Sequence, residues 1–376
     1  MHRIDAFLQL AREQGCSDIH FAVGQPPLVR MDGQLVPLKY RILTAEETEA
    51  ILDEILTETR REELMTRGSA DLSYWGPEIG RFRINVFRKH TGWGAACRVL
   101  PVTVPELSLL GLPSVVSEFA TLTSGLVLVT GGTGCGKSTT LAALINEMNK
   151  HRHSTIVTLE DPVEFVHESR NCQIVQREVG SDIRTFADGL RSALRQDPDV
   201  IMVGELRDPE SIALAIEASE TGHLVLGTLH TRGAYQTLHR MVDVFPADAQ
   251  YQVRHTLSEN LRAVVSQELV RLADGRGRRA VAEIMVVTPA VAQLIREQKI
   301  FQVPATMATG RRLGMQLMDQ ALLSLVKSGD IDPDEAFLRA GDKSDLARYV
   351  TRADLLSLVD DASGAPGPRA QAAEKS

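Results

Sequence analysis

The residues with the most recognisable chemistry lie in one glycine-rich stretch. Residues 131–138 read Gly, four further residues, then Gly, Lys and Ser, a pattern typical of a loop that binds nucleotide phosphates. Glycines allow the backbone to approach a polyphosphate closely because no Cβ intervenes. The residues predicted to bind the nucleotide here are Gly131, Gly132, Thr133, Gly134, Cys135, Gly136, Lys137, Ser138 and Thr139.

The segments on either side of this loop are those that its chemistry requires. The apolar run 126–129 predicts a buried parallel strand, and the segment 139–145 predicts the first turns of a helix. Loop N–H groups and the helix N-terminus would present partial positive charge to the phosphates. Lys137 is expected to reach the β- and γ-phosphates, and the hydroxyl of Ser138 to hold Mg²⁺. The alternative, a glycine-rich turn without a ligand, does not explain this order of elements, so ATP and Mg²⁺ are the predicted cofactors.

Polar residues also follow the next three predicted strands, and the carboxyl ends of parallel strands are where such sheets bind ligands. The sequence LEDPVE places Glu164 after the second strand, and by itself this acidic turn is better explained as a solvated surface turn. Glu205 directly follows the strand VIMV and one glycine, which is the position of a carboxylate that binds Mg²⁺ through water. His230 follows the fourth strand, and by itself it is equally consistent with a structural role.

Arginines cluster in the N-terminal part of the chain. Arg81 and Arg83 lie two residues apart on one predicted strand and therefore share a face, and Arg98 lies on the partner strand. Such a cluster is able to neutralise γ-phosphate charge, whereas ordinary surface arginines are the simpler alternative. The basic segment 271–279 is interpreted as a solvated hairpin rather than a nucleic-acid surface.

Composition restricts the class of protein. The net charge of −8 argues against nucleic acid as a partner of the whole surface. The cysteines, Cys16, Cys97, Cys135 and Cys172, form no CxxC pair, so neither a zinc site nor a disulfide framework is predicted. No apolar run approaches the roughly 20 residues that a membrane helix needs. A soluble cytoplasmic protein is expected.

The predicted fold class is α/β, with two domains. Residues 1–103 alternate like an antiparallel sheet with amphipathic helices and form an α+β domain. Residues 104–121, which contain several prolines, are predicted to be a linker. Residues 122–360 alternate apolar strands with helices, which is typical of a parallel sheet, and residues 361–376 are predicted to be a disordered tail.

In their order and separations, these motifs resemble the secretion ATPase superfamily and, within it, the type IV pilus retraction ATPases of the PilT/PilU kind. The resemblance covers about residues 3–350 and rests on SDIHFAVGQPPLVRMDG, GRFRINVF, GGTGCGKSTT, TLEDPVEFVHE, IVQREVG, LRSALRQDPDVIMVGELRD, TGHLVLGTLHT, VFPAD and LGMQLMDQAL. It implies a PAS-like N-terminal domain, a RecA-like P-loop ATPase domain and a homohexameric ring. Closure of the domains around ATP and Mg²⁺ would power pilus retraction and twitching motility.

The resemblance also implies roles for single residues. Glu164 matches the glutamate that activates water, and Glu205 matches the Walker B acid that binds Mg²⁺. The residues implied to contact the nucleotide are His223 and His230 of the His box, with Arg83 and Arg98 of the N-terminal domain. Whether Arg81 or Arg88 joins them stays open.

One departure from the family concerns retraction rather than hydrolysis. The family signature AIRNLIRE reads AVAQLIRE here, so that Ala292 and Gln293 replace Arg and Asn. An accessory subunit of the PilU type, whose own hydrolysis is dispensable, is therefore an alternative to an independent motor. A P-loop translocase stimulated by nucleic acid is a further alternative, which the acidic composition opposes. The expected partners are an inner-membrane pilus platform protein and possibly a paralogous retraction ATPase, with the chain peripheral at the inner membrane only through this machine.

Overall fold

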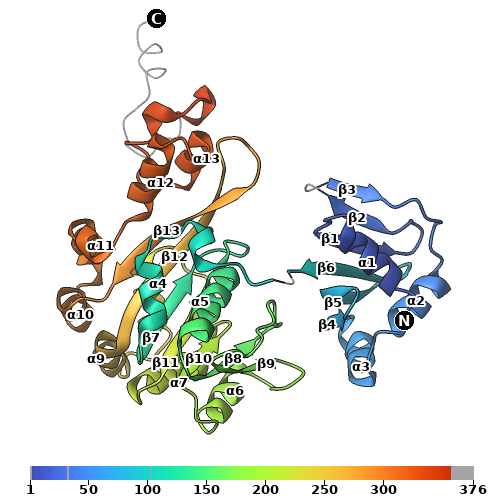
Figure 1. Cartoon of the computed structure of the whole chain (residues 1–376), viewed down its shortest axis with the longest axis horizontal. Coiled ribbons are helices and arrows are strands. Elements are labelled where there is room, and N and C mark those ends of the chain that lie inside the picture. The colour runs from blue at the N-terminus through green and yellow to red at the C-terminus, as the bar shows by residue number, and fades with distance from the viewer. Residues whose placement is uncertain (1, 32–33, 102, 357–376) are drawn as a thin grey trace, which may run out of the picture. The chain divides into compact units, whose positions relative to one another are not determined.

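The computed structural model describes residues 2–31, 34–101 and 103–356 (Figure 1). The chain divides into two compact units. The first comprises residues 1–104 and the short segment 162–166, and the second comprises residues 105–161 and the chain from residue 167 onward. The predicted tail at residues 361–376 lies outside the described residues.

The first unit is a six-stranded antiparallel sheet in the order β3-β2-β1-β6-β5-β4. In β5, the alternate residues Phe82, Ile84 and Val86 are fully buried in the apolar core, whereas Arg81 and Arg83 lie on the opposite face. The elements are α1 (Asp5–Glu13), β1 (Asp18–Ala22), β2 (Leu28–Met31), β3 (Gln34–Pro37), α2 (Ala45–Asp53), α3 (Glu58–Arg67), β4 (Ser69–Gly76), β5 (Gly80–Lys89) and β6 (Gly92–Leu100).

The second unit contains the predicted parallel sheet. Its seven strands follow the order β13-β12-β7-β11-β10-β8-β9, and all neighbours are parallel except β12 and β13, which form an antiparallel hairpin. The strands are β7 (Gly125–Thr130), β8 (Thr155–Glu160), β9 (Gln173–Glu178), β10 (Val200–Val203), β11 (Leu224–Leu229), β12 (Leu261–Arg271) and β13 (Arg278–Val286).

Helices cover both faces of this sheet (Figure 1). Leu126 and Leu128 of β7 pack into one apolar cluster, and Val127 and Val129 pack into the other, as expected for a strand with both faces buried. The cluster with Val127 contains α4 (Val115–Glu118) and α5 (Lys137–His151). The cluster with Leu126 contains α6 (Phe186–Ala193), α7 (Pro209–Glu220), α8 (Ala234–Asp243), α9 (Gln250–Asn260), α10 (Pro289–Arg296) and α11 (Val303–Thr309).

The proline-containing stretch before β7 is packed against the second unit. It forms the 3-10 turns η1 (Leu107–Leu110) and η2 (Phe119–Thr121) on either side of α4. The buried side chains of Leu107, Val116 and Phe119 belong to the same apolar cluster as α5. This stretch therefore contributes to the support of the helix that follows the glycine-rich loop.

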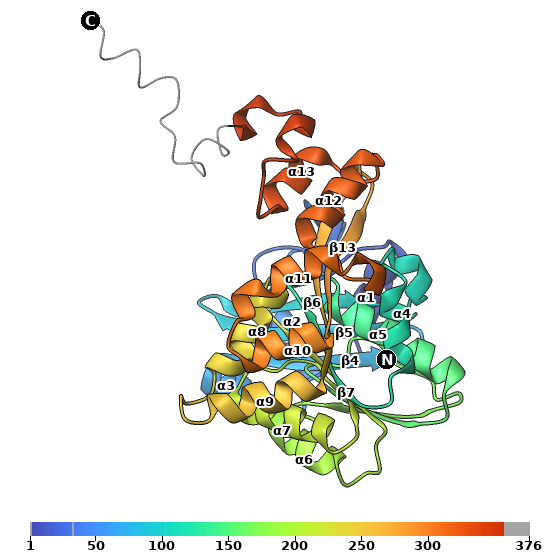
Figure 2. The ribbon, with the colours of Figure 1, turned by 90° about the vertical axis from the view of Figure 1, so that its left-hand side faces the viewer.

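The C-terminal elements form a smaller core of their own. Val270 and Val281 of the β12–β13 hairpin pack against these helices, and Figure 2 shows α12 and α13 together next to this hairpin. The elements of this core are α12 (Met318–Lys327), α13 (Pro333–Arg339), η5 (Ala347–Tyr349) and η6 (Ala353–Leu355). The short turns η3 (Ile300–Gln302) and η4 (Arg311–Leu313) precede them outside this core. Among the described residues, no helix is both long and apolar enough to cross a membrane.

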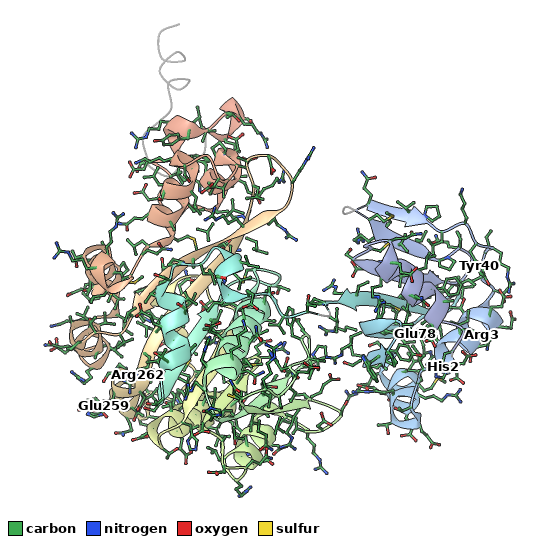
Figure 3. The ribbon with its side chains drawn as sticks, viewed as in Figure 1. His2, Arg3, Tyr40, Glu78, Glu259 and Arg262 are labelled. Atoms are coloured by element: carbon green, nitrogen blue, oxygen red, sulfur yellow. The ribbon has the colours of Figure 1, made fainter. Side chains whose placement is uncertain are left out.

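The amino end of β7 is fixed by Arg262, which lies where α9 passes into β12 (Figure 3). Its guanidinium donates from Nε to the carbonyl of Ser124 at 3.3 Å and from Nη1 to the carbonyl of Glu259 at 3.0 Å. A Cβ at Gly125 would lie 2.6 Å from Cγ of Arg262, so only glycine fits there. This contact holds the strand that leads into the loop.

Candidate nucleotide-binding site

The glycine-rich loop lies at the carboxyl edge of the parallel sheet. In the strand register, Thr130 at the end of β7 faces Leu229 at the end of β11, and Val203 at the end of β10 faces Leu159 of β8. The residues that follow these strands therefore lie along one edge. This edge carries the loop, His230, Glu205 and Glu160 in the order in which the strands pair.

Glycine is required at several positions of the loop itself. Gly131, Gly134 and Gly136 have φ angles of +138°, +75° and +95°, which side chains with a Cβ rarely adopt. At Gly131 a Cβ would also lie 2.3 Å from the carbonyl oxygen of Gln267. Gly136 immediately precedes α5, so the loop delivers the chain directly into the helix N-terminus. The predicted strand, loop and helix are confirmed.

Lys137 is the first residue of α5 and is 9% exposed. Its ammonium donates hydrogen bonds to the carbonyl oxygens of Gly131 at 2.9 Å and Gly132 at 3.1 Å. These bonds satisfy a buried charge that would otherwise be costly. The lysine is thus held inside the loop that is predicted to bind phosphate. Ser138 is exposed and Thr139 partly exposed.

Cys135 is buried within the same loop and is 6% exposed. Burial raises the pKa of its thiol above the ordinary value, although the nearby positive charge of Lys137 partly opposes the effect. The thiol packs close to Gly131, since a Cβ there would lie 2.7 Å from its sulfur. Cys135 is therefore a packing residue of the loop with a largely protonated thiol at neutral pH.

Glu205 and His230 meet at the edge of the sheet. The carboxylate of Glu205 lies 3.3 Å from Nε2 of His230 and accepts a hydrogen bond from Nη2 of Arg207 at 2.6 Å. Burial raises the pKa of Glu205, but the hydrogen bonds and charges of Arg207 and His230 outweigh burial and hold that pKa below its usual range. Glu205 is therefore ionised at neutral pH, as a ligand of a divalent cation must be.

The acidic residues at and after the end of β8 differ in their exposure to solvent. Glu160 is buried and accepts hydrogen bonds from Oγ1 of Thr158 at 2.8 Å and Nε2 of Gln176 at 3.0 Å. Asp161 is exposed. Glu164 is partly exposed and lies in the segment 162–166, which belongs to the first unit.

The two predicted phosphate-contacting arginines are neighbours within the first unit. Arg83 of β5 and Arg98 of β6 face each other directly in the register of their strands. Like charges at such positions repel, and each arginine has a nearby carboxylate: Asp71 lies 3.9 Å from Arg83, and Asp18 lies 3.0 Å from Arg98. Both side chains stay exposed, at 44% and 67%.

The arginines left open by the sequence differ from this pair. Nη1 of Arg88 donates to the carbonyl of Met65 at 3.2 Å. Nη1 of Arg81 is buried and has no hydrogen-bond partner among the residues that the structure describes. Neither shares the face-to-face arrangement of Arg83 and Arg98, since Arg81 faces Leu100.

The two histidines of the TGHLVLGTLHT segment lie at opposite ends of β11. His230 follows the carboxyl end, beside Glu205, whereas His223 precedes the amino end. Nδ1 of His223 lies 2.9 Å from the carbonyl of Ala218, and the backbone carbonyl of His223 accepts a hydrogen bond from Gly125. A strand of this length spans about 20 Å, so the structure brings His230 but not His223 to the loop edge of the same sheet.

A cavity of about 540 Å³ opens beside the loop. Gly136, Thr139 and Thr140 line it at the loop end, and Leu110 and Leu269 contribute apolar walls farther away. A cavity next to a phosphate loop that combines leucine walls with polar groups, among them Arg278 and Arg279, suits the base and sugar of a nucleotide. The sequence analysis did not identify these wall residues, because they lie in the stretch predicted as a linker and in the β12–β13 hairpin.

Gln267 and Arg207 are further residues that the sequence analysis missed. Gln267 is a polar residue in the apolar run of β12 and is itself buried, and a polar residue at such a position indicates a specific hydrogen-bond partner. Arg207 follows Glu205 by two residues, and such a neighbouring cation is a usual partner for a carboxylate.

Comparison with known proteins identifies the family. Residues 2–328 match the family model described as "Type II/IV secretion system protein". The type IV pilus retraction ATPase PilT of Pseudomonas aeruginosa is 45% identical over 333 residues, which cover 89% of this chain and 96% of that protein. The type IV pilus ATPase PilU of the same organism is 38% identical over 346 residues, covering 92% and 91%.

A solved structure of the pilus retraction motor PilT with bound ADP has 43% sequence identity and a TM-score of 0.86, and it covers 93% of this chain and all of that one. This similarity agrees with the N-terminal α+β domain and the RecA-like sheet described above. With the phosphate loop and these matches combined, the chain belongs to the secretion ATPase superfamily, among the type IV pilus retraction ATPases of the PilT/PilU kind, and it is an ATP-hydrolysing enzyme.

Proposed function

We propose that this chain is the ATP-driven motor subunit that powers retraction of a type IV pilus. The observation that carries the proposal is the arrangement of Lys137, inside the glycine-rich loop, at the same sheet edge as the Glu205–His230 pair. The extensive identity to a pilus retraction ATPase supports the choice of process.

In this proposal the loop residues 131–139 bind the phosphates, and Lys137 exchanges its carbonyl partners for phosphate oxygens. Ser138 and Glu205 offer hard oxygen donors, which fit Mg²⁺. Bound Mg²⁺ would neutralise negative charge that develops on the transferred phosphoryl group. Ionisation of Glu205 at neutral pH supports its part of this role.

Further residues complete the proposed cycle. Glu164 orients the attacking water, His230 contacts the γ-phosphate, and Arg83 and Arg98 neutralise phosphate charge. ATP binding and hydrolysis would then move the N-terminal domain with respect to the ATPase domain. The nucleotide contact assigned to His223 stays a prediction.

The proposed assembly is a homohexameric ring. Its subunits would consist of a PAS-like domain, residues 1–103, and an ATPase domain, residues 122–360, joined through residues 104–121. The ring would act on a platform protein of the inner membrane, possibly beside a paralogous retraction ATPase, and would meet the membrane only through that protein. Nucleic acid has no part in this proposal.

Phosphate release by the purified full chain in the presence of Mg²⁺ tests the proposal. Lys137→Ala and Glu205→Ala should each lower kcat roughly 100-fold or more, because each removes a group that stabilises charge in the transition state. Lys327→Ala and Glu220→Ala, which change exposed residues of the same types, serve as matched controls. Hydrolysis at the unaltered rate in either site variant would contradict the assigned roles.

An accessory subunit with dispensable hydrolysis is the second candidate. The observation that favours it is the AVAQLIRE segment in α10, in which Gln293 donates a hydrogen bond to Glu297 at 2.8 Å and Ala292 is buried. The similarity to PilU is consistent with either candidate. Complementation of twitching by a Lys137 variant distinguishes the two candidates.

A further inference from the structure

Gln267 contacts the first residue of the phosphate loop and the helix α5 that follows the loop. It lies on β12 one residue beyond Ser266, which faces Thr130 at the end of β7, so its backbone reaches the first residue of the loop. Its carbonyl oxygen lies against Gly131, where a Cβ would come within 2.3 Å. Its side-chain Nε2 donates a hydrogen bond to Oγ1 of Thr140 in the first turn of α5, at 2.9 Å.

This connection is buried and therefore rigid. Gln267 and Thr140 are each 1% exposed, so water cannot replace the hydrogen bond between them. The other side-chain atom, Oε1 of Gln267, is also buried and has no hydrogen-bond partner among the described residues. A buried amide that leaves one of its groups unpaired costs free energy, and such groups call for a functional explanation.

We infer that Gln267 is a positioning residue of the nucleotide site, which sets the separation between Gly131 and Thr140 and thereby the width of the phosphate loop. The inference rests on the proposed nucleotide site and adds a residue that contacts the loop rather than the reacting atoms. The strand that carries Gln267 continues into the β12–β13 hairpin and its C-terminal helices. The loop is therefore supported from outside the strand that leads into it.

A double-mutant cycle on nucleotide affinity tests this role. Gln267→Met keeps the side-chain length and removes the amide, and Thr140→Val removes its acceptor. Each should weaken ATP binding about 5- to 30-fold, the range expected when one partner of a buried hydrogen bond is lost. Because both changes remove the same bond, the double variant should bind ATP nearly as well as the weaker single variant.

A conservative variant and a matched control separate an effect on ATP affinity from an effect on the stability of the fold. Thr140→Ser retains the hydroxyl and should keep most of the affinity. Gln316→Met is the control, since Nε2 of Gln316 donates at 2.6 Å to Ala282, the residue that faces Gln267 in β13, without contacting the loop. It should lower the melting temperature and leave ATP affinity unchanged.

Each outcome is decisive for one of the two proposals. An unchanged ATP affinity in Gln267→Met and Thr140→Val, with active wild-type enzyme, overturns the positioning role and leaves the proposed function intact. Additive losses in the double variant also overturn it. A wild-type chain that binds no ATP under the same conditions refutes the proposed function itself. Should Gln267→Met fail to fold, the Thr140→Val and Thr140→Ser pair still gives the answer.

Discussion

At the scale of single residues, the proposed site contains the buried charge of Lys137 and the partly buried charge of Glu205. The ammonium of Lys137 is satisfied by carbonyls of its own loop, and the carboxylate of Glu205 is satisfied by Arg207 and His230. Charges in such surroundings interact more strongly than in water. In the proposed cycle, nucleotide binding therefore exchanges these existing partners for new ones rather than pairing bare charges.

Cys135 should react slowly with thiol reagents. Its raised pKa and burial both oppose formation and attack of the thiolate, so alkylation by iodoacetamide at pH 8 should be at least about 10-fold slower in the folded chain than in the unfolded chain. Mass spectrometry of the peptide that contains Cys135 gives the rate, with Cys135→Ser identifying inhibition that comes from other cysteines. Equal rates in folded and unfolded chains would refute burial of this thiol. Any loss of hydrolysis that does follow alkylation should be slowed by bound ATP.

His167 should make the fold sensitive to mild acid. Burial lowers the pKa of His167 to about 4, whereas an unfolded histidine titrates near 6.5. Between these values the unfolded chain binds the proton and the folded chain does not. The contribution of His167 to the free energy of unfolding is therefore fully present above pH 6.5 and is lost as pH falls toward 4. The free energy of unfolding should drop by about 2 kcal/mol between pH 7 and pH 5 from this residue.

Urea unfolding of His167→Gln at these two pH values isolates the effect of that histidine. The variant should show a smaller drop than the natural chain, by most of the amount attributed to His167. His151→Gln, which changes an exposed histidine on α5, is the matched control and should leave the drop unchanged. An equal drop in His167→Gln and the natural chain would show that folding does not lower the pKa of His167.

At the scale of elements, the site depends on strands that end together. Four neighbouring parallel strands, β7, β11, β10 and β8, bring segments far apart in the sequence to one edge. The antiparallel β12–β13 hairpin differs, because β12 extends beyond the end of β7 and there contacts the loop through Gln267. The ends of helices depend instead on capping residues close by in the sequence, as Thr44 at the start of α2 shows.

Thr44→Ala should destabilise the N-terminal domain without changing hydrolysis. Thr44 accepts a hydrogen bond from the N–H of Glu47, and the carboxylate of Glu47 accepts one from the N–H of Thr44, so that the two residues form a capping box. Loss of this cap should cost about 1 kcal/mol in the free energy of unfolding. Urea unfolding measures the change, and Thr59→Ala, at an exposed position inside α3, should be neutral or slightly stabilising. A large fall in kcat for Thr44→Ala would contradict a purely local role.

At the scale of the whole molecule, the chain combines an antiparallel α+β unit that carries the Arg83–Arg98 pair with a parallel unit that carries the phosphate loop. The C-terminal helices add a third, smaller core to the second unit. Whether hydrolysis by this chain is itself required for retraction is a property of the assembly, and it is tested in cells.

If this chain is the retraction motor, the Lys137→Ala variant should fail to restore twitching in cells that lack the chain. In the proposed mechanism the lysine is needed for hydrolysis, and it belongs to none of the apolar cores, so the variant protein should still accumulate. Lys327→Ala, at an exposed position of α12, should restore twitching fully. Restored twitching with Lys137→Ala would instead favour the accessory role.

Local patterns in the sequence by themselves determined the phosphate loop, its flanking elements and the ends of helices. The loop at 131–138, its preceding strand and following helix, the Glu205 position and the Thr44 cap all depend on residues close together in the chain. The length of β11 also separates His223 from His230 without reference to any other element, although the family resemblance implied that both contact the nucleotide. Such features follow from periodicity, glycine spacing and capping chemistry, which neighbouring residues determine.

Only the tertiary structure decided which distant groups meet. Gln267 and Thr140 are 127 residues apart, and no local pattern marks one as the hydrogen-bond partner of the other. The pairing of Glu205 with His230 likewise depends on the order of β10 and β11 in the sheet. A polar residue in a buried strand must find a partner, but the strand order and register determine which partner it finds.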